Sequence, residues 1–172
     1  MKLLSASAAL LTLALTACIP TTQAPQTSNA LPSSTVPIPD PKGMTAADIS
    51  SFKGTVSATA EVPTNTSAVS GSILLILFKK DKTALVTGQV TNLSGAPTAQ
   101  HIHAPALTGE NAPVFKPLDS SLSNINAYKI SGSFKLTDAE IADLKAGKFY
   151  FNIHTTAHPG GEGRAQLQGT PE

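Results

Sequence analysis

Short apolar runs separated by turn residues most constrain what this chain can fold into. Eight such runs lie between residues 52 and 168, and Gly, Pro, Asn or charged residues separate them. Runs at this spacing are typical of an all-β sandwich or barrel. We therefore expect an all-β, antiparallel, Greek-key-like sandwich or barrel of about eight strands. The expected strands are residues 52–62, 67–78, 83–93, 98–104, 112–118, 127–136, 148–155 and 162–168.

One helix is expected between the last strands. Thr137 and Glu140 have the spacing of a capping box, in which the side chain of each accepts a hydrogen bond from the backbone amide of the other. Ile141 and Leu144 give a small apolar stripe, and Gly147 suits the left-handed residue that ends a helix. The sequence therefore predicts a short helix that packs on the strands.

The first seventeen residues have the features of a secretory signal peptide. Lys2 supplies a positive charge, and the uncharged run 3–15 is too short for a membrane span, which takes about 20 apolar residues. Residues 15–18 read Leu-Thr-Ala-Cys and resemble the lipobox of bacterial lipoproteins. The resemblance implies that Cys18 is lipidated and anchors the mature chain to a membrane, since more than one acyl chain gives stable anchoring.

Ile19 follows this cysteine. In Gram-negative lipoproteins an aspartate at this place commonly signals retention in the inner membrane. The resemblance therefore implies a lipid-anchored protein of the cell envelope, with the outer membrane favoured if the host has one.

A proline-rich linker is expected after the anchor. Residues 19–41 hold six of the thirteen prolines and a single charged residue, Asp40. Such a stretch cannot bury enough apolar surface to offset its ordering entropy, so we expect residues 18–50 to be a disordered tether. Within it, Thr45 and Asp48 have the spacing of a short capped helical turn. The domain is expected at residues 51–169, with a tail at 170–172.

Charge and cysteine content exclude several classes of protein. The formal net charge is +1, and it falls to zero when the signal peptide takes Lys2 with it, leaving 11 basic and 11 acidic residues. A neutral chain lacks the basic excess of a nucleic-acid-binding protein, so no nucleic-acid partner is expected. The single cysteine excludes an internal disulfide and a multi-cysteine metal cage.

All four histidines lie in two short segments. In an extended backbone His101 and His103 share one face, because side chains alternate along a strand. The same alternation sends Tyr150, Asn152 and His154 to the more polar face of their strand, and His158 follows four residues later.

Three interpretations of the histidines compete. A His-x-His pair on a strand can give two imidazoles to copper or zinc, with His154 or His158 completing the shell. Alternatively, the histidines pin the loop 105–113 by hydrogen bonds. Catalysis is the third, but the chain lacks a Gly-x-Ser-x-Gly elbow, a His-Glu-x-x-His motif and a phosphate-binding glycine loop.

Glu162 and Arg164 are the other polar pair. Two residues apart on a strand, they face the same way and are expected to form a structural ion pair with each other or with a neighbouring strand.

Several blocks of the sequence, in order, resemble the CHRD domain, the module named after chordin. The resemblance covers about residues 52–169. Members usually read Glu-Ile-Arg-Gly-Gln in the last block, where this chain has Gly163 and Ala165, so we expect looser packing of the final strand. The blocks are Glu-Val-Pro at 61–63, Thr-Ala-Gln-His-Ile-His-Ala-Pro-Ala at 98–106, Asn-Ala-Pro-Val at 111–114, Leu-Lys-Ala-Gly at 144–147, Tyr-Phe-Asn-Ile-His-Thr at 150–155 and His-Pro-Gly-Gly-Glu-Gly-Arg-Ala-Gln-Leu at 158–167.

The resemblance implies a fold but no established activity. In chordin these domains occur in an extracellular antagonist of growth-factor signalling, whereas bacterial members are secreted or envelope proteins, mostly without an assigned activity. The domain is also similar to the copper/zinc superoxide dismutase sandwich, whose strand carries a comparable His-x-His. The two-metal site of that enzyme needs more than the four histidines present here, and its fold holds a disulfide, so a dinuclear dismutase is excluded.

The sequence as a whole predicts a lipid-anchored envelope protein whose domain is a non-enzymatic binding or structural module. Its partners would be the membrane, through Cys18, and an envelope protein or extracellular ligand. A nested hypothesis is that this module binds one copper or zinc ion through His101, His103 and His154, with His158 as a candidate fourth ligand. The alternative is a mononuclear metalloenzyme, a copper oxidase or a dismutase-like protein.

Overall fold

The computed structural model of the chain describes residues 35–124 and 126–170. These residues form ten strands, one α-helix and two short 3-10 helices, and each of the eight predicted runs overlaps a strand. The strands β6 and β10 were not predicted. The elements are η1 (Ala46–Asp48), β1 (Ile49–Ser57), η2 (Ala58–Ala60), β2 (Ser70–Phe78), β3 (Thr83–Thr91), β4 (Pro97–His103), β5 (Val114–Pro117), β6 (Asp119–Asn124), β7 (Ala127–Lys135), α1 (Asp138–Lys145), β8 (Tyr150–Thr155), β9 (Gly163–Gln166) and β10 (Gln168–Gly169).

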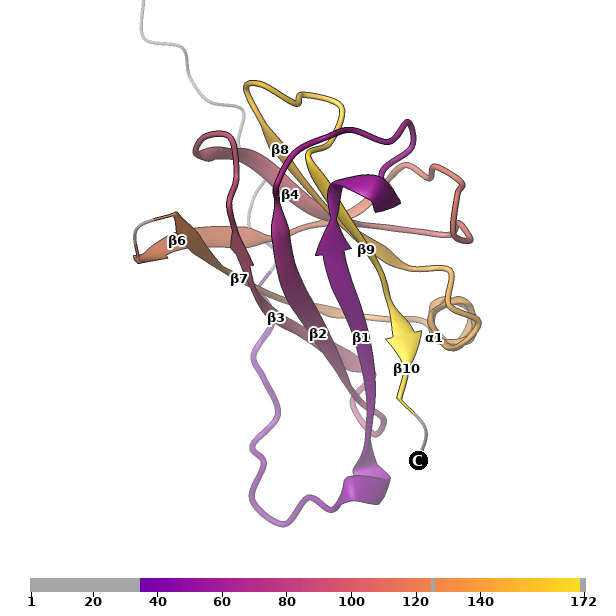
Figure 1. The fold of residues 1–172 in the computed structure, drawn as a ribbon. Helices are drawn as coiled ribbons and strands as arrows, with labels where there is room; N and C mark the ends of the chain where they lie inside the picture. Colours follow the sequence, from indigo (N-terminus) through magenta and orange to yellow (C-terminus); the bar gives the residue numbers. More distant parts are fainter. Residues whose placement is uncertain (1–34, 125, 171–172) are drawn as a thin grey trace, which may run out of the picture.

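The strands form one antiparallel sheet that curls into a nearly closed barrel (Figure 1). The order is β5-β4-β8-β9-β1-β2-β3-β7-β6, and β10 adds to β1. The two end strands, β5 and β6, are separated in sequence only by Leu118, whose amide donates to the carbonyl of Gln100 at 3.0 Å. This link holds the ends of the sheet near each other, and the predicted fold class is confirmed.

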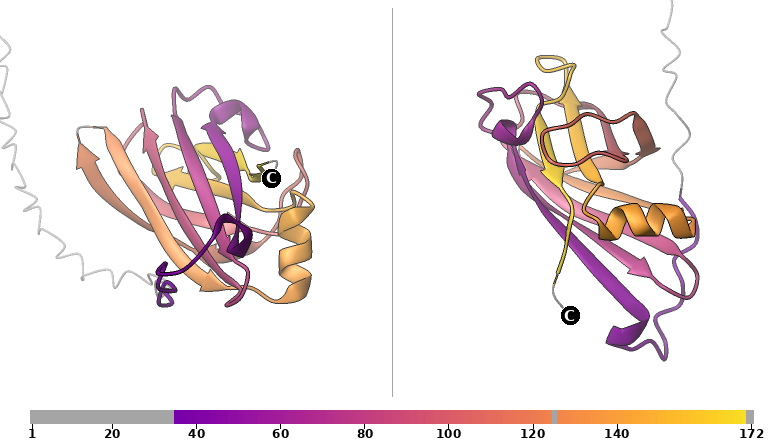
Figure 2. Two further views of the ribbon diagram at one scale, coloured as in Figure 1. Left: turned by 90° about the horizontal axis from the view of Figure 1, so that it is seen from below. Right: turned by 90° about the vertical axis from the view of Figure 1, so that its right-hand side faces the viewer.

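The core side chains lie inside the barrel, between the two sides of the curled sheet that the view from below shows (Figure 2). Alternate residues of each long strand point inward, so that β2 buries Ile73, Leu75 and Leu77 almost completely while the residues between them are partly exposed. Phe134 and Phe151, from opposite sides of the sheet order, join the same cluster. Burial of each such side chain stabilises the fold by about 1.5–3 kcal/mol.

The predicted helix is confirmed at its capping residues. The amide of Glu140 donates to Thr137 Oγ1 at 3.3 Å, and the amide of Thr137 donates to Glu140 Oε2 at 2.7 Å. Gly147 has a φ of +71°, the left-handed conformation expected after the helix, and Leu144 is fully buried. In Figure 1 the helix lies beside β10. Within the described ranges no helix is long and apolar enough to cross a membrane.

The packing of the final strand corrects one expectation. A Cβ atom at Gly163 would lie 2.8 Å from Val56 Cγ1 and 3.0 Å from Val69 Cγ1, so these valines already fill the space beside the glycine. Ala165 is fully buried. The looser packing expected here is wrong, because larger neighbours occupy the volume that the glycine leaves.

The N-terminal described residues also contact the domain earlier than the expected boundary at residue 51. Thr35 bridges Ser133 in parallel orientation, the amide of Val36 donates to the Ser133 carbonyl at 3.3 Å, and Ser133 Oγ donates to the Val36 carbonyl at 2.6 Å. β6 pairs with β7 only as far as Ser131. Residues 35–38, which we call the strap, cover the edge of β7 beyond that point.

The other boundary expectations have mixed outcomes. The helical turn is present as η1, where the amide of Thr45 donates to Asp48 Oδ2 at 2.7 Å. Thr170, assigned to the tail, donates its amide to Ser51 at 2.9 Å and so belongs to the folded domain. The predicted signal peptide and Cys18 lie outside the described residues.

A first prediction concerns the strap. Ser133→Ala removes the hydrogen bond from Ser133 Oγ to Val36, which should weaken strap docking by about 0.5–1.5 kcal/mol. Hydrogen exchange should show faster exchange of the Val36 amide in this variant. Ser131→Ala, at an exposed serine two residues away, is the control and should leave it unchanged. Equal exchange in both variants would show that the serine hydroxyl does not hold the strap.

Candidate metal centre

The pairing of β4 with β8 creates the site. These neighbouring antiparallel strands place His101 opposite Asn152 and His103 opposite Tyr150. His154 lies two residues beyond Asn152 and is therefore a diagonal neighbour of His101. The alternate residues Ile102, Phe151 and Ile153 are fully buried in the core, so the histidines are held on the outer face of the barrel.

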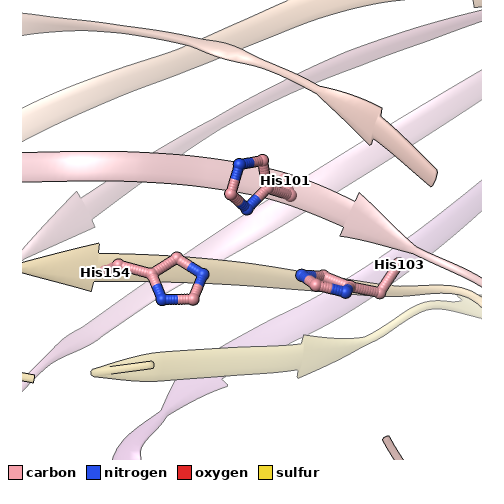
Figure 3. A group of neighbouring side chains, drawn as sticks. All are labelled: His101, His103 and His154. Atoms are coloured by element: carbon pink, nitrogen blue, oxygen red, sulfur yellow. The ribbon is translucent and has the colours of Figure 1, made fainter. Parts of the chain in front are cut away.

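Three of the four histidines come together on this face. The rings of His101, His103 and His154 converge from two strands (Figure 3), and one nitrogen from each lies within 4.8 Å of the other two. Two nitrogens bound to one zinc ion at about 2.0 Å would be about 3.3 Å apart. Side-chain adjustments of about 1 Å would therefore let the three nitrogens share an ion.

In two of the three rings, the Nδ1 atom is held by a backbone carbonyl. His103 Nδ1 lies 2.9 Å from the Ala112 carbonyl, and His154 Nδ1 lies 3.0 Å from the Pro159 carbonyl. Because a carbonyl only accepts, each Nδ1 carries the hydrogen and each Nε2 keeps a free lone pair. Proteins orient metal-binding histidines in this way.

The remaining nitrogens are buried and have no hydrogen-bond partner. They are His101 Nδ1, His103 Nε2 and His154 Nε2, three of the four ring nitrogens that no carbonyl binds, and each belongs to a ring of the convergent cluster. Buried polar atoms without partners are rare in folded proteins because each costs stability. A cation bound between the three lone pairs would satisfy all of them at once.

Burial favours the neutral form of two rings in the cluster. Burial lowers the pKa of His101 to about 4, with smaller contributions from His154 and His103. Burial also lowers the pKa of His103, although its hydrogen bond to Ala112 acts in the opposite direction. Neutral imidazoles are the form that binds metals.

A stack of side chains supports His103 from behind. The Tyr150 ring lies parallel to the His103 ring, with 4.8 Å between centroids and 3° between planes. The Arg164 guanidinium carbon lies 3.5 Å from the Tyr150 ring centroid. Tyr150 Oη also accepts a hydrogen bond from the Ala112 amide at 3.1 Å, next to the carbonyl that holds His103. Alternation had placed Tyr150 on this face, but its contact with His103 was not predicted.

Arg164 and His103 also secure the loop 105–113. Arg164 Nη2 donates to the Leu107 carbonyl at 3.3 Å, and Nη1 donates to Asn111 Oδ1 at 3.4 Å. The structural interpretation of the histidines therefore holds for His103, which binds Ala112 of this loop through Nδ1. It does not compete with metal binding, because the loop uses one ring nitrogen and leaves the other free.

The structure corrects the expectation of an ion pair between Glu162 and Arg164. Glu162 precedes β9 rather than lying within it, so strand alternation does not set its direction. Both residues are buried, but they bind different partners. Glu162 accepts hydrogen bonds from Ser67 Oγ at 2.6 Å, from the Ser94 amide at 2.7 Å and hydroxyl at 2.8 Å, and from the Thr155 hydroxyl.

Glu61 is the acidic residue that interacts electrostatically with Arg164. Its carboxylate accepts a hydrogen bond from Asn152 Nδ2. Burial raises the pKa of Glu61 to about 7, although Arg164, the Val62 amide and Asn152 each lower it. The sequence analysis assigned Glu61 no role, because its burial beside the strand that carries His154 depends on tertiary contacts alone.

His158 lies apart from the three convergent histidines. It follows β8 in the turn toward β9, where its amide donates to the Thr155 carbonyl at 3.1 Å, and it lines a surface hollow with Glu61 and Pro63. The expectation of His158 as a fourth ligand does not match this placement, because the turn carries the residue away from the face that alternation governs.

A comparison with known protein families identifies the family of the domain. The family model of the CHRD domain matches residues 52–167, and the chain belongs to the CHRD domain family. Searches of curated proteins and of solved structures gave no match. Family membership suggests a binding or structural module, and among the described residues the histidine cluster is a group that could hold a metal ion.

A second prediction concerns Glu162. Burial would raise the pKa of its carboxyl, but the hydrogen bonds from Ser67, Thr155 and Ser94 outweigh burial and lower that pKa. The carboxylate therefore contributes stability above its unfolded pKa of about 4.3, and this contribution is lost as pH falls through the folded value. Glu162→Gln should reduce the free energy of unfolding by about 2–3 kcal/mol at pH 7, and by less at acidic pH.

Urea unfolding at several pH values measures this difference. Glu110→Gln, at an exposed carboxylate that accepts from the Leu107 amide, is the control and should change stability little. A Glu162→Gln deficit that stays constant from neutral to acidic pH would contradict the role assigned to the carboxylate.

Proposed function

We propose that this CHRD domain is a non-enzymatic binding or structural module of the cell envelope, and that it holds one copper or zinc ion through His101, His103 and His154. The observation that carries the metal proposal is the convergence of three buried, unpartnered nitrogens. Imidazole nitrogens suit both metals. The carbonyls of Ala112 and Pro159 supply the outer contacts that ligating histidines need.

The burial of the donor atoms favours binding over catalysis. A catalytic metal keeps a coordination position that substrate or water can reach. Here the three donor nitrogens are buried, which favours an ion enclosed by its ligands over one that is open to a reactant. The alternative of a copper oxidase or a dismutase-like enzyme is therefore the weaker proposal.

The sequence supports attachment of this module to a membrane. Residues 15–18 have the order of a lipobox and contain the only cysteine of the chain, and the proline-rich segment that follows can act as a spacer. Lipidated Cys18 would hold the domain at the surface of an envelope membrane, where it can meet an envelope protein or an extracellular ligand.

The third prediction tests the anchor. Cys18→Ser removes the sulfur that would carry the lipid, so the full-length variant should lose incorporation of labelled fatty acid and leave the membrane fraction. Ser7→Ala, inside the predicted signal peptide but outside the lipobox, is the control and should keep both. Membrane association and labelling of the Cys18→Ser variant at the original level would refute the lipoprotein assignment.

The fourth prediction tests the metal site. His101→Ala removes one of three ligands and should weaken copper or zinc binding more than about 100-fold, since losing outer contacts alone costs about 10–100-fold. His158→Ala, at the histidine outside the cluster, should bind metal as the natural protein does. Isothermal titration with Zn(II) and Cu(II) measures both. Binding that survives in His101→Ala, or that depends equally on His158, would contradict the proposed ligand set.

A further inference from the structure

The identity of the ion can be narrowed from the donors, and this step rests on the metal site proposed above. Within the described residues, the convergent group consists of three imidazoles and no carboxylate. All three are neutral donors, so they bring no negative charge to offset that of the ion. A bound Zn(II) or Cu(II) would leave two uncompensated positive charges beneath the protein surface, whereas Cu(I) would leave one.

The acidic groups near the site do not correct this balance. Glu162 accepts hydrogen bonds from Ser67, Ser94 and Thr155. Glu61 is bound by Asn152 and lies close enough to Arg164 for the guanidinium to lower its pKa. Neither carboxylate is a member of the convergent group. Because the cost of burying an ion grows with the square of its charge, an uncompensated site favours the ion of lower charge.

Arg164 adds a positive charge behind the cluster. Its guanidinium stacks on Tyr150, and Tyr150 stacks in turn on His103. The charge of Arg164 therefore lies one aromatic ring away from the His103 imidazole. At a separation of about 10 Å and an effective dielectric constant of about 20, each positive charge on the ion would cost about tenfold in affinity.

The burial of the donors also limits the coordination number. A water molecule in the fourth position of a tetrahedral ion would rest against all three ligating nitrogens. His101 Nδ1, His103 Nε2 and His154 Nε2 are themselves buried, which favours an ion held without a bound water. Zinc in proteins is almost always four-coordinate. Cu(I), a closed-shell ion, is stable with three nitrogen donors.

We propose that the site formed by His101, His103 and His154 is selective for Cu(I), which it binds with three nitrogen ligands and no water. The site would therefore bind a soft metal ion that carries a single positive charge. Zn(II) is the competing ion that the charge balance and the burial of the donor atoms disfavour.

The decisive experiment compares the two ions on the natural protein. Under anaerobic conditions, Cu(I) affinity is measured by competition with bathocuproine disulfonate, and Zn(II) affinity by competition with a chromogenic zinc chelator. We expect Cu(I) to bind at least about 100-fold more tightly, combining the Arg164 field with the loss of a fourth ligand. X-ray absorption of the Cu(I) form should show three nitrogens at about 2.0 Å.

The outcomes separate the two proposals. Zn(II) binding as tight as Cu(I), or a four-coordinate Cu(I) site, overturns the selectivity and leaves the metal site in place. Failure of both ions to bind, or binding that is unchanged in His101→Ala, overturns the metal site itself.

A charge variant tests the physical cause. Arg164→Gln removes the positive charge and should raise Zn(II) affinity relative to Cu(I) by about tenfold, whereas Arg164→Lys keeps the charge and should leave the ratio near that of the natural protein. An unchanged ratio in folded Arg164→Gln would overturn the electrostatic argument. If Arg164→Gln does not fold, the comparison of the two ions on the natural protein still decides the selectivity.

Discussion

The pairing of β4 with β8 is the interaction on which the rest of the site depends. Its register sets His101 opposite Asn152 and His103 opposite Tyr150, and it brings His154 diagonally to His101. The same pairing is held in place from the other face, because Ile102, Phe151 and Ile153 are buried in the barrel core. A shift of one residue would turn the imidazoles into the core and the apolar residues outward, so hydrophobic burial enforces the geometry of the polar cluster.

The outer face of these strands is itself organised as a second, polar core. The loop 105–113 lies over it and is held by Arg164, whose guanidinium donates to Leu107 and Asn111. Tyr150 connects this loop to the histidines, since it binds the Ala112 amide and stacks on His103. Because Arg164 is shared between loop, ring stack and Glu61, the stability of the loop and the electrostatics of the cluster are not independent.

The sequence predicted most of the strands because their signals are local. Apolar alternation and turn residues mark each of the eight runs, and the capping residues Thr137 and Glu140 mark α1. β6, whose sequence is Asp-Ser-Ser-Leu-Ser-Asn, was missed because it has almost no apolar residues and owes its extended form to pairing with β7. β10 has two residues, too few for a pattern.

The site was predictable only as far as alternation applies. Alternation correctly placed His101, His103 and His154 on one face of their strands. It failed for Glu162 and gave no placement for His158, because both lie in the connection between β8 and β9, where turn geometry decides the direction of a side chain. The register of β4 against β8, and the stack of Arg164 on Tyr150, join residues distant in sequence and leave no local signal.

The three unpartnered nitrogens have an energetic consequence for the whole domain. Each buried acceptor without a partner costs about 1–3 kcal/mol, and the cost falls on the folded state because water satisfies the same atoms in the unfolded chain. The core contacts behind β4 and β8 must outweigh this cost for the cluster to keep its shape. A metal ion would remove the cost and add its own binding energy, because it would bind the assembled cluster better than the unfolded chain. Metal affinity and folding stability would then be linked through the register of β4 against β8.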